Sequence, residues 1–346
     1  MMYCLMHKDV YVADIVIDEA DGTLLRKGKV YEKSHMPVGT VRKGIVDGNA
    51  LRHWWAGRSI PASRDGIEDV LRGLGIPSTT LLIEKCMGLS LSDQYWIRPR
   101  GSDTAWADVN FFENEFSEDM GDLLLGARAD AGHISMRSPD NTSDGVLRKR
   151  WKIFDGRRCL VKAGSGPLMQ EPFNEAIASI LMGSQGIDHV EYSLAWQGRR
   201  PVCICEDFIG PDTELVTGYG LTRSVPKDRG RTTYALYVSV CEEAGIDIVP
   251  FLDRMLAIDY IMMNGDRHMN NFGLVRDAET LEYLGPAPVY DTGTSLGCDV
   301  RTEWFPEEIS DSAKPFESTF EKQLGLVSDL SWFDGDAMLS ALPRVE

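Results

Sequence analysis

The chain has 346 residues, a length that suits one large or two moderate domains with a sizeable core. Hydrophobic residues make up 43% and charged residues 26%, as in ordinary globular proteins, while the formal net charge is −17. Such an acidic chain is not expected to bind nucleic acid directly or to coat anionic membranes, because both functions require a basic surface. A local basic cleft for a nucleotide is still compatible with this charge.

The apolar segments and the cysteines predict the compartment. No run approaches the roughly 18 apolar residues of a membrane span, and the N-terminus lacks the apolar stretch of a signal peptide. The seven cysteines are odd in number and scattered, so we expect free thiols in a cytoplasmic protein. Cys203 and Cys205 have no second pair nearby, which favours a strand with small side chains over a metal site.

The first part of the chain begins with strand-like alternation and continues as short helices. Residues 3–30 predict two or three strands, with a hairpin turn at Asp21-Gly22. Residues 91–99 predict an irregular aromatic segment, whose rings we expect mainly in the core. Helices or other buried elements are expected at 50–55, 66–73, 81–89 and 111–125.

Small polar residues between positions 137 and 148 precede a predicted strand. From Ser138 to Gly145 we expect a flexible loop that folds over phosphates, because successive backbone N–H groups can cradle an anion. Neither the Walker pattern nor the glycine-rich pattern of eukaryotic kinases is present. The basic residues that follow suit either an anionic acceptor group or the solvent face of a strand: Arg148, Lys149, Arg150 and Lys152.

A lysine ends the second strand of the next predicted hairpin. Lys162 follows an apolar run, and a buried ammonium needs a charged partner. A helix begins at Glu171-Pro172, since proline suits the first helical turn. Glu175 in that helix is the preferred partner, and Glu171 is the alternative. The same sequence would also be found if the lysine were exposed and the acidic start of the helix faced solvent, with no ion pair between them.

A second hairpin, 190–196 with 201–205, leads into a connector at Glu206 to Pro211. Residues 213–228 are expected to be loop-like, and 232–244 to form a helix. Further helices are expected near the C-terminus, around 316–324 and 336–342.

The most informative stretch follows a predicted buried helix at 255–263. That helix is expected to end at Asn264-Gly265, and Asp266-Arg267-His268 comes next, with Asn271 five residues after Asp266. After a predicted strand pair, Asp291 lies 25 residues downstream of Asp266. Phosphoryl transfer from ATP requires one carboxylate for the attacking hydroxyl, and a second carboxylate with an amide oxygen for magnesium. This stretch supplies all three.

The DRHxxN motif with its downstream Asp-x-Gly resembles the catalytic loop and metal-binding aspartate of HipA-like kinases, which are Ser/Thr kinases of the toxin–antitoxin type. The motif is also similar to the catalytic loop of phosphoinositide kinases. The resemblance implies an α+β, two-lobed protein-kinase-like fold with an N-terminal α/β extension. The domains would be 1–125 for the extension, 126–209 for the kinase N-lobe, and 210–346 for the helical C-lobe.

The resemblance also implies roles for individual residues, with ATP and Mg²⁺ as cofactors. Asp266 would orient the acceptor hydroxyl, while His268 would contact phosphate or accept the proton. Asn271 and Asp291 would bind magnesium. The residues implied in nucleotide binding are Lys162, Glu175, Glu206, Phe208, Ser138 and Gly145.

We therefore expect a Ser/Thr protein kinase with an unidentified protein substrate and an antitoxin-type partner. HipA-like kinases autophosphorylate a serine in the phosphate loop, which silences them. Here the candidate acceptors are Ser138, Thr142 and Ser143. Two other functions use the same residues. One is a kinase for a lipid or small-molecule hydroxyl, and the other is a pseudokinase that serves as a nucleotide-binding interaction module.

Overall fold

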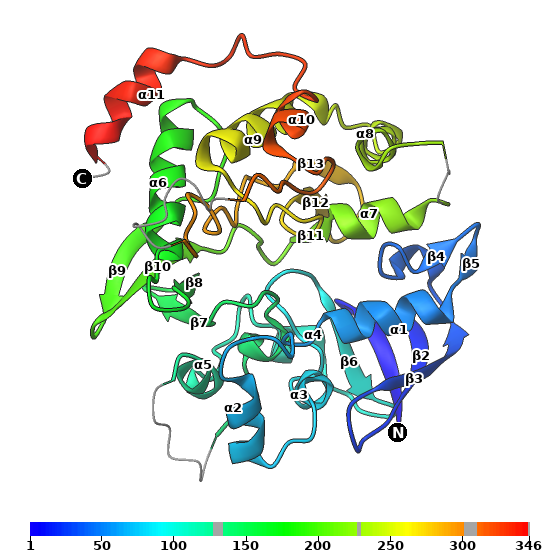
Figure 1. The fold of residues 1–346 in the computed structure, drawn as a ribbon. Coiled ribbons are helices and arrows are strands. Elements are labelled where there is room, and N and C mark those ends of the chain that lie inside the picture. The colour runs from blue at the N-terminus through cyan, green and yellow to red at the C-terminus, as the bar shows by residue number, and fades with distance from the viewer. Residues whose placement is uncertain (127–133, 227–229, 301–309, 345–346) are drawn as a thin grey trace.

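The computed structural model describes residues 1–126, 134–226, 230–300 and 310–344. Figure 1 shows the N-terminal region at the bottom and a mainly helical part at the top, with the strands β7 to β10 at the left between them. None of the described helices is long and apolar enough to cross a membrane. All seven cysteines are free thiols.

The N-terminal region is built on an antiparallel sheet in the order β3-β2-β1-β6. The strands predicted between residues 3 and 30 are present, and helices pack on the sheet through Trp55 and Ile83. A small hairpin, β4 with β5, extends from it. The bounds are β1 (Met2–His7), β2 (Val10–Ile17), β3 (Leu24–Val30), β4 (Val41–Arg42), β5 (Ile45–Val46), α1 (Gly48–Gly57), α2 (Ile67–Leu74), α3 (Thr79–Lys85) and β6 (Tyr95–Pro99).

Strand β6 lies in the segment that was predicted to be irregular. It pairs antiparallel with β1. Tyr95 and Ile97 pack into one core cluster and Trp96 into another, so both faces of the strand are buried. A strand covered on both faces lacks the apolar–polar alternation by which strands are predicted, which explains the error.

The helix predicted at 111–125 is also wrong over most of its length. Only α4 (Trp106–Val109) and α5 (Asp119–Leu124) are helical. Asn110 ends α4 in an extended conformation, and its side-chain oxygen accepts a hydrogen bond from the backbone N–H of Glu113. Because this side chain replaces a helical hydrogen bond, the phenylalanines that follow enter the core from irregular backbone.

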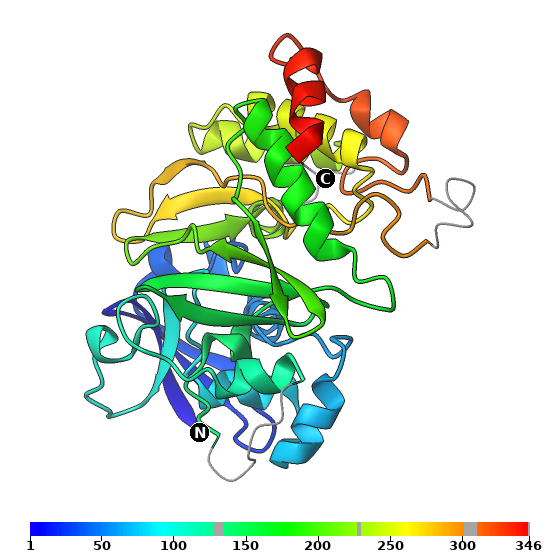
Figure 2. The same ribbon diagram turned by 90° about the vertical axis from the view of Figure 1, so that its left-hand side faces the viewer.

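The second sheet has the order β7-β8-β10-β9, and α6 packs against β8 and β10 (Figure 2). Both predicted hairpins are present, and α6 has proline in its first turn as expected. The bounds are β7 (Lys149–Phe154), β8 (Arg157–Ala163), α6 (Glu171–Ser184), β9 (Ser193–Gln197) and β10 (Arg200–Glu206).

The upper part contains a three-stranded sheet in the order β11-β12-β13 and a core of helices around α9. Residues 213–224 were predicted to be loop-like, but they form β11 and α7, and the side chain of Thr217 caps α7 by accepting from the N–H of Gly220. The bounds are β11 (Thr213–Thr217), α7 (Gly218–Ser224), α8 (Thr233–Glu243), α9 (Val249–Met262), β12 (Gly273–Asp277), β13 (Tyr283–Pro286), α10 (Phe320–Leu324) and α11 (Gly335–Ala341).

Helix α9 ends directly before the predicted Asn264-Gly265 turn, and the left-handed residue that ends it is Met263. Met263 adopts the left-handed conformation with φ of 52°, whereas Asn264 and Gly265 do not. The N–H of Asn264 bonds to the carbonyl of Asp259 and so closes the helix end.

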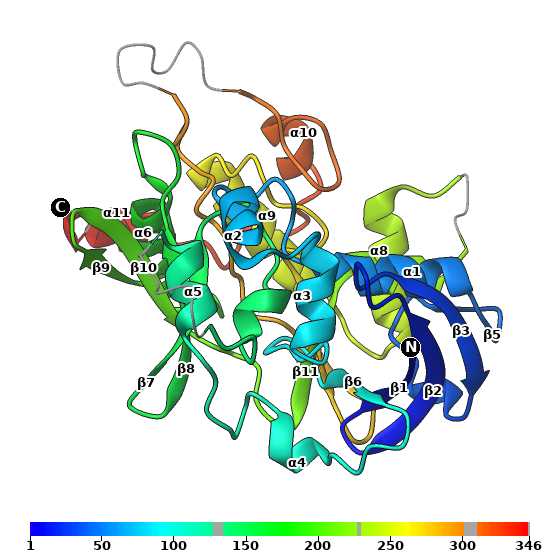
Figure 3. The same cartoon turned by 90° about the horizontal axis from the view of Figure 1, so that it is seen from below.

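A buried polar cluster joins the N-terminal sheet to the upper part. His7 on β1 contacts Glu214 on β11 (Nε2 to Oε2, 2.9 Å), and Arg276 on β12 donates to the other oxygen of Glu214 (2.6 Å). The second ring nitrogen of His7 contacts His35 (3.0 Å). Figure 3 shows β11 close to β6, and the N–H of Leu215 bonds to the carbonyl of Ser92. The predicted boundary between domains 1–125 and 126–209 is followed directly by residues 127–133, which lie outside the described residues.

Candidate active site

The loop that carries the DRHxxN motif, Asp266 to Asn271, is held by a buried ion pair. Asp259 on α9 binds the guanidinium of Arg267 through both carboxylate oxygens at 2.9 Å. Arg267 also donates to the carbonyls of Asn271 and Tyr290 and to the hydroxyl of Thr292. Burial alone would lower the pKa of Arg267, but the charge of Asp259 outweighs it and raises the pKa. Arg267 therefore ties the loop to the segment that carries Asp291.

A second ion-pair group connects the two lobes. The ammonium of Lys162 contacts both Glu175 and Asp291. The other oxygen of Glu175 accepts the backbone N–H of Thr292 at 2.8 Å. Glu171, the alternative partner, instead binds Ser165. Burial lowers the pKa of Lys162, but the two carboxylates more than compensate, so the ammonium stays charged.

Asp291 has an unusual backbone and electrostatic setting. Its φ is 59°, a conformation that non-glycine residues seldom adopt and that occurs preferentially at functional sites. Burial raises the pKa of its carboxyl, but the charges of Lys162 and Lys149 outweigh this and bring the pKa below its usual range. Asp291 is therefore ionised and available as an oxygen ligand.

The loop residues from Asp266 to Asn271 form successive tight turns. The N–H of His268 bonds to the carbonyl of Asp266, and the N–H of Asn271 to the carbonyl of His268, each at 2.8 Å. The amide nitrogen of Asn271 donates to the same Asp266 carbonyl at 3.2 Å. The Asp266 carboxylate does not contact Arg267. It accepts a hydrogen bond from Lys314 at 2.7 Å.

Lys314 belongs to a turn that sequence reasoning did not connect with the site. Gln323 on α10 is buried, and its side chain donates to the carbonyl of Lys314 and accepts the N–H of Phe316. Phe316 in turn packs against Phe272 and Tyr237 in the helical core. The turn is thus fixed on both sides and places an ammonium on the Asp266 carboxylate.

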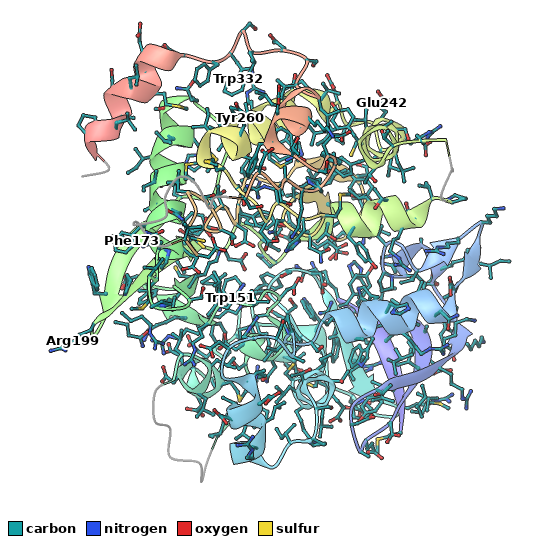
Figure 4. The ribbon with its side chains drawn as sticks, viewed as in Figure 1. Trp151, Phe173, Arg199, Glu242, Tyr260 and Trp332 are labelled. Atoms are coloured by element: carbon teal, nitrogen blue, oxygen red, sulfur yellow. The ribbon has the colours of Figure 1, made fainter. Side chains whose placement is uncertain are left out.

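These elements surround one cavity of about 400 Å³. Its wall includes residues from the N-terminal region and from both lobes, and Trp151 lies where these parts meet (Figure 4). Arg199, by contrast, is at the outer tip of the β9–β10 hairpin. The predicted site residues in the wall are Lys162, Glu206, Phe208, His268, Asn271, Asp291, Thr142, Ser143 and Gly145. Asp266, Glu175 and Ser138 are not among the residues that line this cavity.

The connector after β10 borders the cavity with one ring and one carboxylate. Phe208 packs against Tyr290, with ring centroids 5.4 Å apart. The carboxylate of Glu206 is exposed and pairs with Arg157 at 3.2 Å. Four residues of the connector line the cavity: Glu206, Asp207, Phe208 and Ile209.

The segment from Ser138 to Gly145, here called the phosphate loop, was expected to be flexible, and its conformation in the structure is ordered and largely buried. Its hydroxyls are hydrogen-bonded: Ser138 to the Asp140 carboxylate, Thr142 to the Leu89 carbonyl, and Ser143 to the Asp140 carbonyl. Asp140 also accepts the N–H of Trp151 at 2.8 Å. Burial raises the pKa of Asp140 to about 7, despite these hydrogen bonds.

Lys149 is a second buried lysine at the cavity, which the sequence analysis placed only in a basic strand. It lies directly across from Lys162 in the β7–β8 pairing, so the two side chains share one face of the sheet. Among the described residues its ammonium has no ion-pair partner, and burial lowers its pKa to about 8. Counting alternate positions in both strands would have revealed the shared face.

No protein-family profile and no curated protein matches the chain. Among solved structures, the chain is similar to HipA of the Shewanella oneidensis MR-1 toxin–antitoxin system, solved in complex with HipB and operator DNA. That match has a TM-score of 0.55 and 13% identity, and it covers 99% of this chain and 88% of HipA. A second match is to the Helicobacter pylori proinflammatory kinase CtkA, with 23% identity and a TM-score of 0.39, over 45% of this chain and 58% of CtkA. The fold of this protein is therefore that of a HipA-like kinase, as the DRHxxN resemblance predicted.

Proposed function

We propose that the protein is an ATP- and Mg²⁺-dependent Ser/Thr protein kinase. The observation that carries the proposal is the convergence of Lys162, Asn271 and Asp291 on one cavity, with Asp266 on the same loop as Asn271 and bonded to it through its backbone carbonyl. Lys162 would bind the α- and β-phosphates, and Lys149 would add a second positive charge. The Asp266 carboxylate would accept the proton of the attacking hydroxyl as the phosphoryl group moves to that oxygen and ADP leaves.

The oxygen ligands fit magnesium. Among the described residues, no three His, Cys, Asp or Glu side chains are grouped to hold a metal. Magnesium in kinases needs only one or two protein oxygens, because phosphates and water complete its coordination. Asp291 offers an ionised carboxylate, and Asn271 turns its amide nitrogen to Asp266, which leaves the amide oxygen for the metal. Bound there, magnesium would neutralise charge on the phosphates.

The basic residues at 148–152 give little support to the alternative function, a kinase for a lipid or small-molecule hydroxyl. A phosphoinositide headgroup would require unpaired cations near the cleft. Three of the four basic residues are paired, Arg148 with Asp65, Arg150 with Asp122 and Lys152 with Glu118, so among the described residues Lys149 is the one cation of this strand that has no ion-pair partner at the cavity. The pseudokinase alternative is disfavoured because a binding module has no need for every residue of the phosphotransfer set. By likeness to the HipA complex, we also propose an antitoxin-type protein partner.

Autophosphorylation of the phosphate loop is part of the proposal. Ser138, Thr142 and Ser143 are buried, so phosphorylation of any of them requires the loop to leave its place. A phosphate adds about two negative charges. Beside Asp140 and the nucleotide's own phosphates, that charge would keep the loop out and lower the affinity for ATP.

One experiment tests transfer and its acceptor. Purified protein is incubated with labelled ATP and magnesium, with a generic protein substrate and with lipid vesicles in separate reactions, and intact mass follows phosphate on the protein itself. Asp266→Asn should abolish transfer yet retain Mg-ATP binding, because the amide keeps the shape but cannot accept a proton. Asp69→Asn, at an exposed carboxylate on α2, is the matched control. Equal losses of ATP binding and of rate in Asp266→Asn would exclude this role for Asp266.

A further inference from the structure

Among the described residues, the side chain of one arginine in the N-terminal region donates only to the phosphate loop. Arg64 lies between α1 and α2 and is 2% exposed. Its Nε donates to the carbonyl of Gly145 at 2.9 Å, and one terminal nitrogen donates to the hydroxyl of Ser143 at 2.8 Å. The other terminal nitrogen donates to the carbonyls of Ser143 (2.6 Å) and Asp144 (2.9 Å). All four hydrogen bonds therefore end on three consecutive residues.

This guanidinium is a buried charge that the loop alone solvates. Within the described parts of the chain, Arg64 forms no ion pair. Burial lowers the pKa of Arg64 to about 10, so it remains protonated at neutral pH. A buried charge is tolerated when hydrogen bonds replace its water, and here the carbonyls of residues 143–145 provide them. If the loop left, Arg64 would lose every one of these bonds, so the two hold each other in place.

The same contacts orient the loop toward the cavity. In a trans peptide unit the carbonyl and the following N–H point in opposite directions. Because the carbonyls of residues 143–145 face Arg64, the N–H groups of residues 144–146 face away from it. Residues 142–145 line the cavity, whereas Arg64 does not. The N–H groups of residues 144 and 146 therefore lie on the side of the loop opposite Arg64, while the N–H of Gly145 donates to the Asp144 carboxylate at 2.6 Å.

A second contact from the N-terminal region supports the same position. The hydroxyl of Thr142 donates to the carbonyl of Leu89 at 2.7 Å. Next to Arg64, Asp65 pairs with Arg148 at the start of β7 (2.7 Å). The N-terminal region thus holds both ends of the segment that borders the phosphate site.

We propose that Arg64 is a positioning residue that latches the phosphate loop in its nucleotide-binding conformation, so that the N-terminal region sets the affinity for ATP. The proposal rests on the kinase function proposed above. It assigns to the N-terminal region a regulatory contact with the site, because a ligand or partner that moved Arg64 would release the loop.

The test compares Arg64→Lys and Arg64→Gln with wild type by hydrogen–deuterium exchange and by Mg-ATP titration. Arg64→Lys keeps the positive charge but loses the planar guanidinium, whose N–H groups donate in several fixed directions. Arg158→Lys is the matched control, since Arg158 also joins the second sheet to carbonyls of the N-terminal region, at Phe111 and Asn114, away from the loop. Both Arg64 variants should exchange faster in peptides covering 138–148 but not in those covering β8 and β10.

Mg-ATP affinity in both Arg64 variants should fall by about tenfold or more, as expected for losing at least one charge-assisted hydrogen bond. The KM for ATP should rise while kcat at saturating ATP changes little. Unchanged exchange of 138–148, or a uniform rise across all peptides, would overturn the latch. So would a kcat loss with unchanged KM. Wild-type protein that binds no Mg-ATP would instead refute the kinase function, and the exchange data would still decide the latch.

Discussion

The charged residues at the cleft form ion pairs with residues from distant parts of the chain. Lys162 on β8 meets Glu175 on α6 and Asp291 from the other lobe. Glu175 is itself anchored by the N–H of Thr292. The sequence allowed the Lys162–Glu175 pairing to be predicted, because a buried lysine requires a carboxylate and the next helix offers one. It gave no sign that Arg64 and Lys314 would reach the site, because their partners are remote in sequence.

The Lys162–Glu175 pair should act as a unit. Lys162→Ala and Glu175→Ala should each reduce kcat/KM by similar factors, and the double variant should be little worse than either, since residues with one shared role give non-additive losses. Steady-state kinetics of the four proteins measure the coupling. Glu171→Ala is the matched control, because Glu171 binds Ser165 instead, and its loss should be smaller. Fully additive losses would contradict the coupling.

At the scale of elements, prediction succeeded for several strands and helices. The first three strands, both hairpins of the second sheet and helices α6, α8 and α9 were all predicted from alternation or periodicity. It failed for β6, which is buried on both faces, and for β11, whose interior carries a buried Glu214. A charged residue such as Glu214 argues against a buried strand unless its ion-pair partner is known. That partner, Arg276, lies 62 residues away in the sequence, so the pairing could not be anticipated.

The phosphate loop should respond to pH through Asp140. A carboxyl whose pKa is raised by folding favours the protonated form, so the free energy of unfolding should decrease as the pH rises from about 4 through about 7. Asp140→Asn keeps an acceptor for the N–H of Trp151 but cannot ionise. Urea denaturation at about pH 5 and about pH 8 should show a smaller pH-dependent decrease in the variant, by about 2 kcal/mol. Identical decreases in both proteins would show that Asp140 does not titrate in this range.

At the scale of the whole molecule, the N-terminal region contacts both lobes of the kinase-like fold. The N-terminal region reaches the phosphate loop through Arg64 and the upper sheet through the cluster of His7, Glu214 and Arg276. A core cluster also combines Trp96 of the N-terminal sheet with Ile209 of the connector. These contacts bridge the cleft, so the region restrains the movement of one lobe relative to the other.

Breaking the polar cluster should weaken the entire fold. Glu214→Gln leaves the buried guanidinium of Arg276 without a carboxylate, which should lower the free energy of unfolding by about 3 kcal/mol. Asp69→Asn, which breaks an exposed pair with Arg72, should cost less than about 1 kcal/mol. Urea denaturation followed by tryptophan fluorescence and by circular dichroism measures both. If Glu214→Gln lowered the free energy of unfolding by as little as the control does, the cluster would contribute little to stability.

The His7–Glu214 contact has a consequence for biosynthesis. The two residues are separated by 207 positions, so His7 leaves the ribosome long before its partner has been translated. Until then the N-terminal sheet cannot bury its polar edge, and contacts of such high sequence separation form slowly. The nascent chain should therefore pass through a stage in which the end of the N-terminal sheet that carries His7 is not yet covered by β11, and molecular chaperones would have the most to protect at that stage.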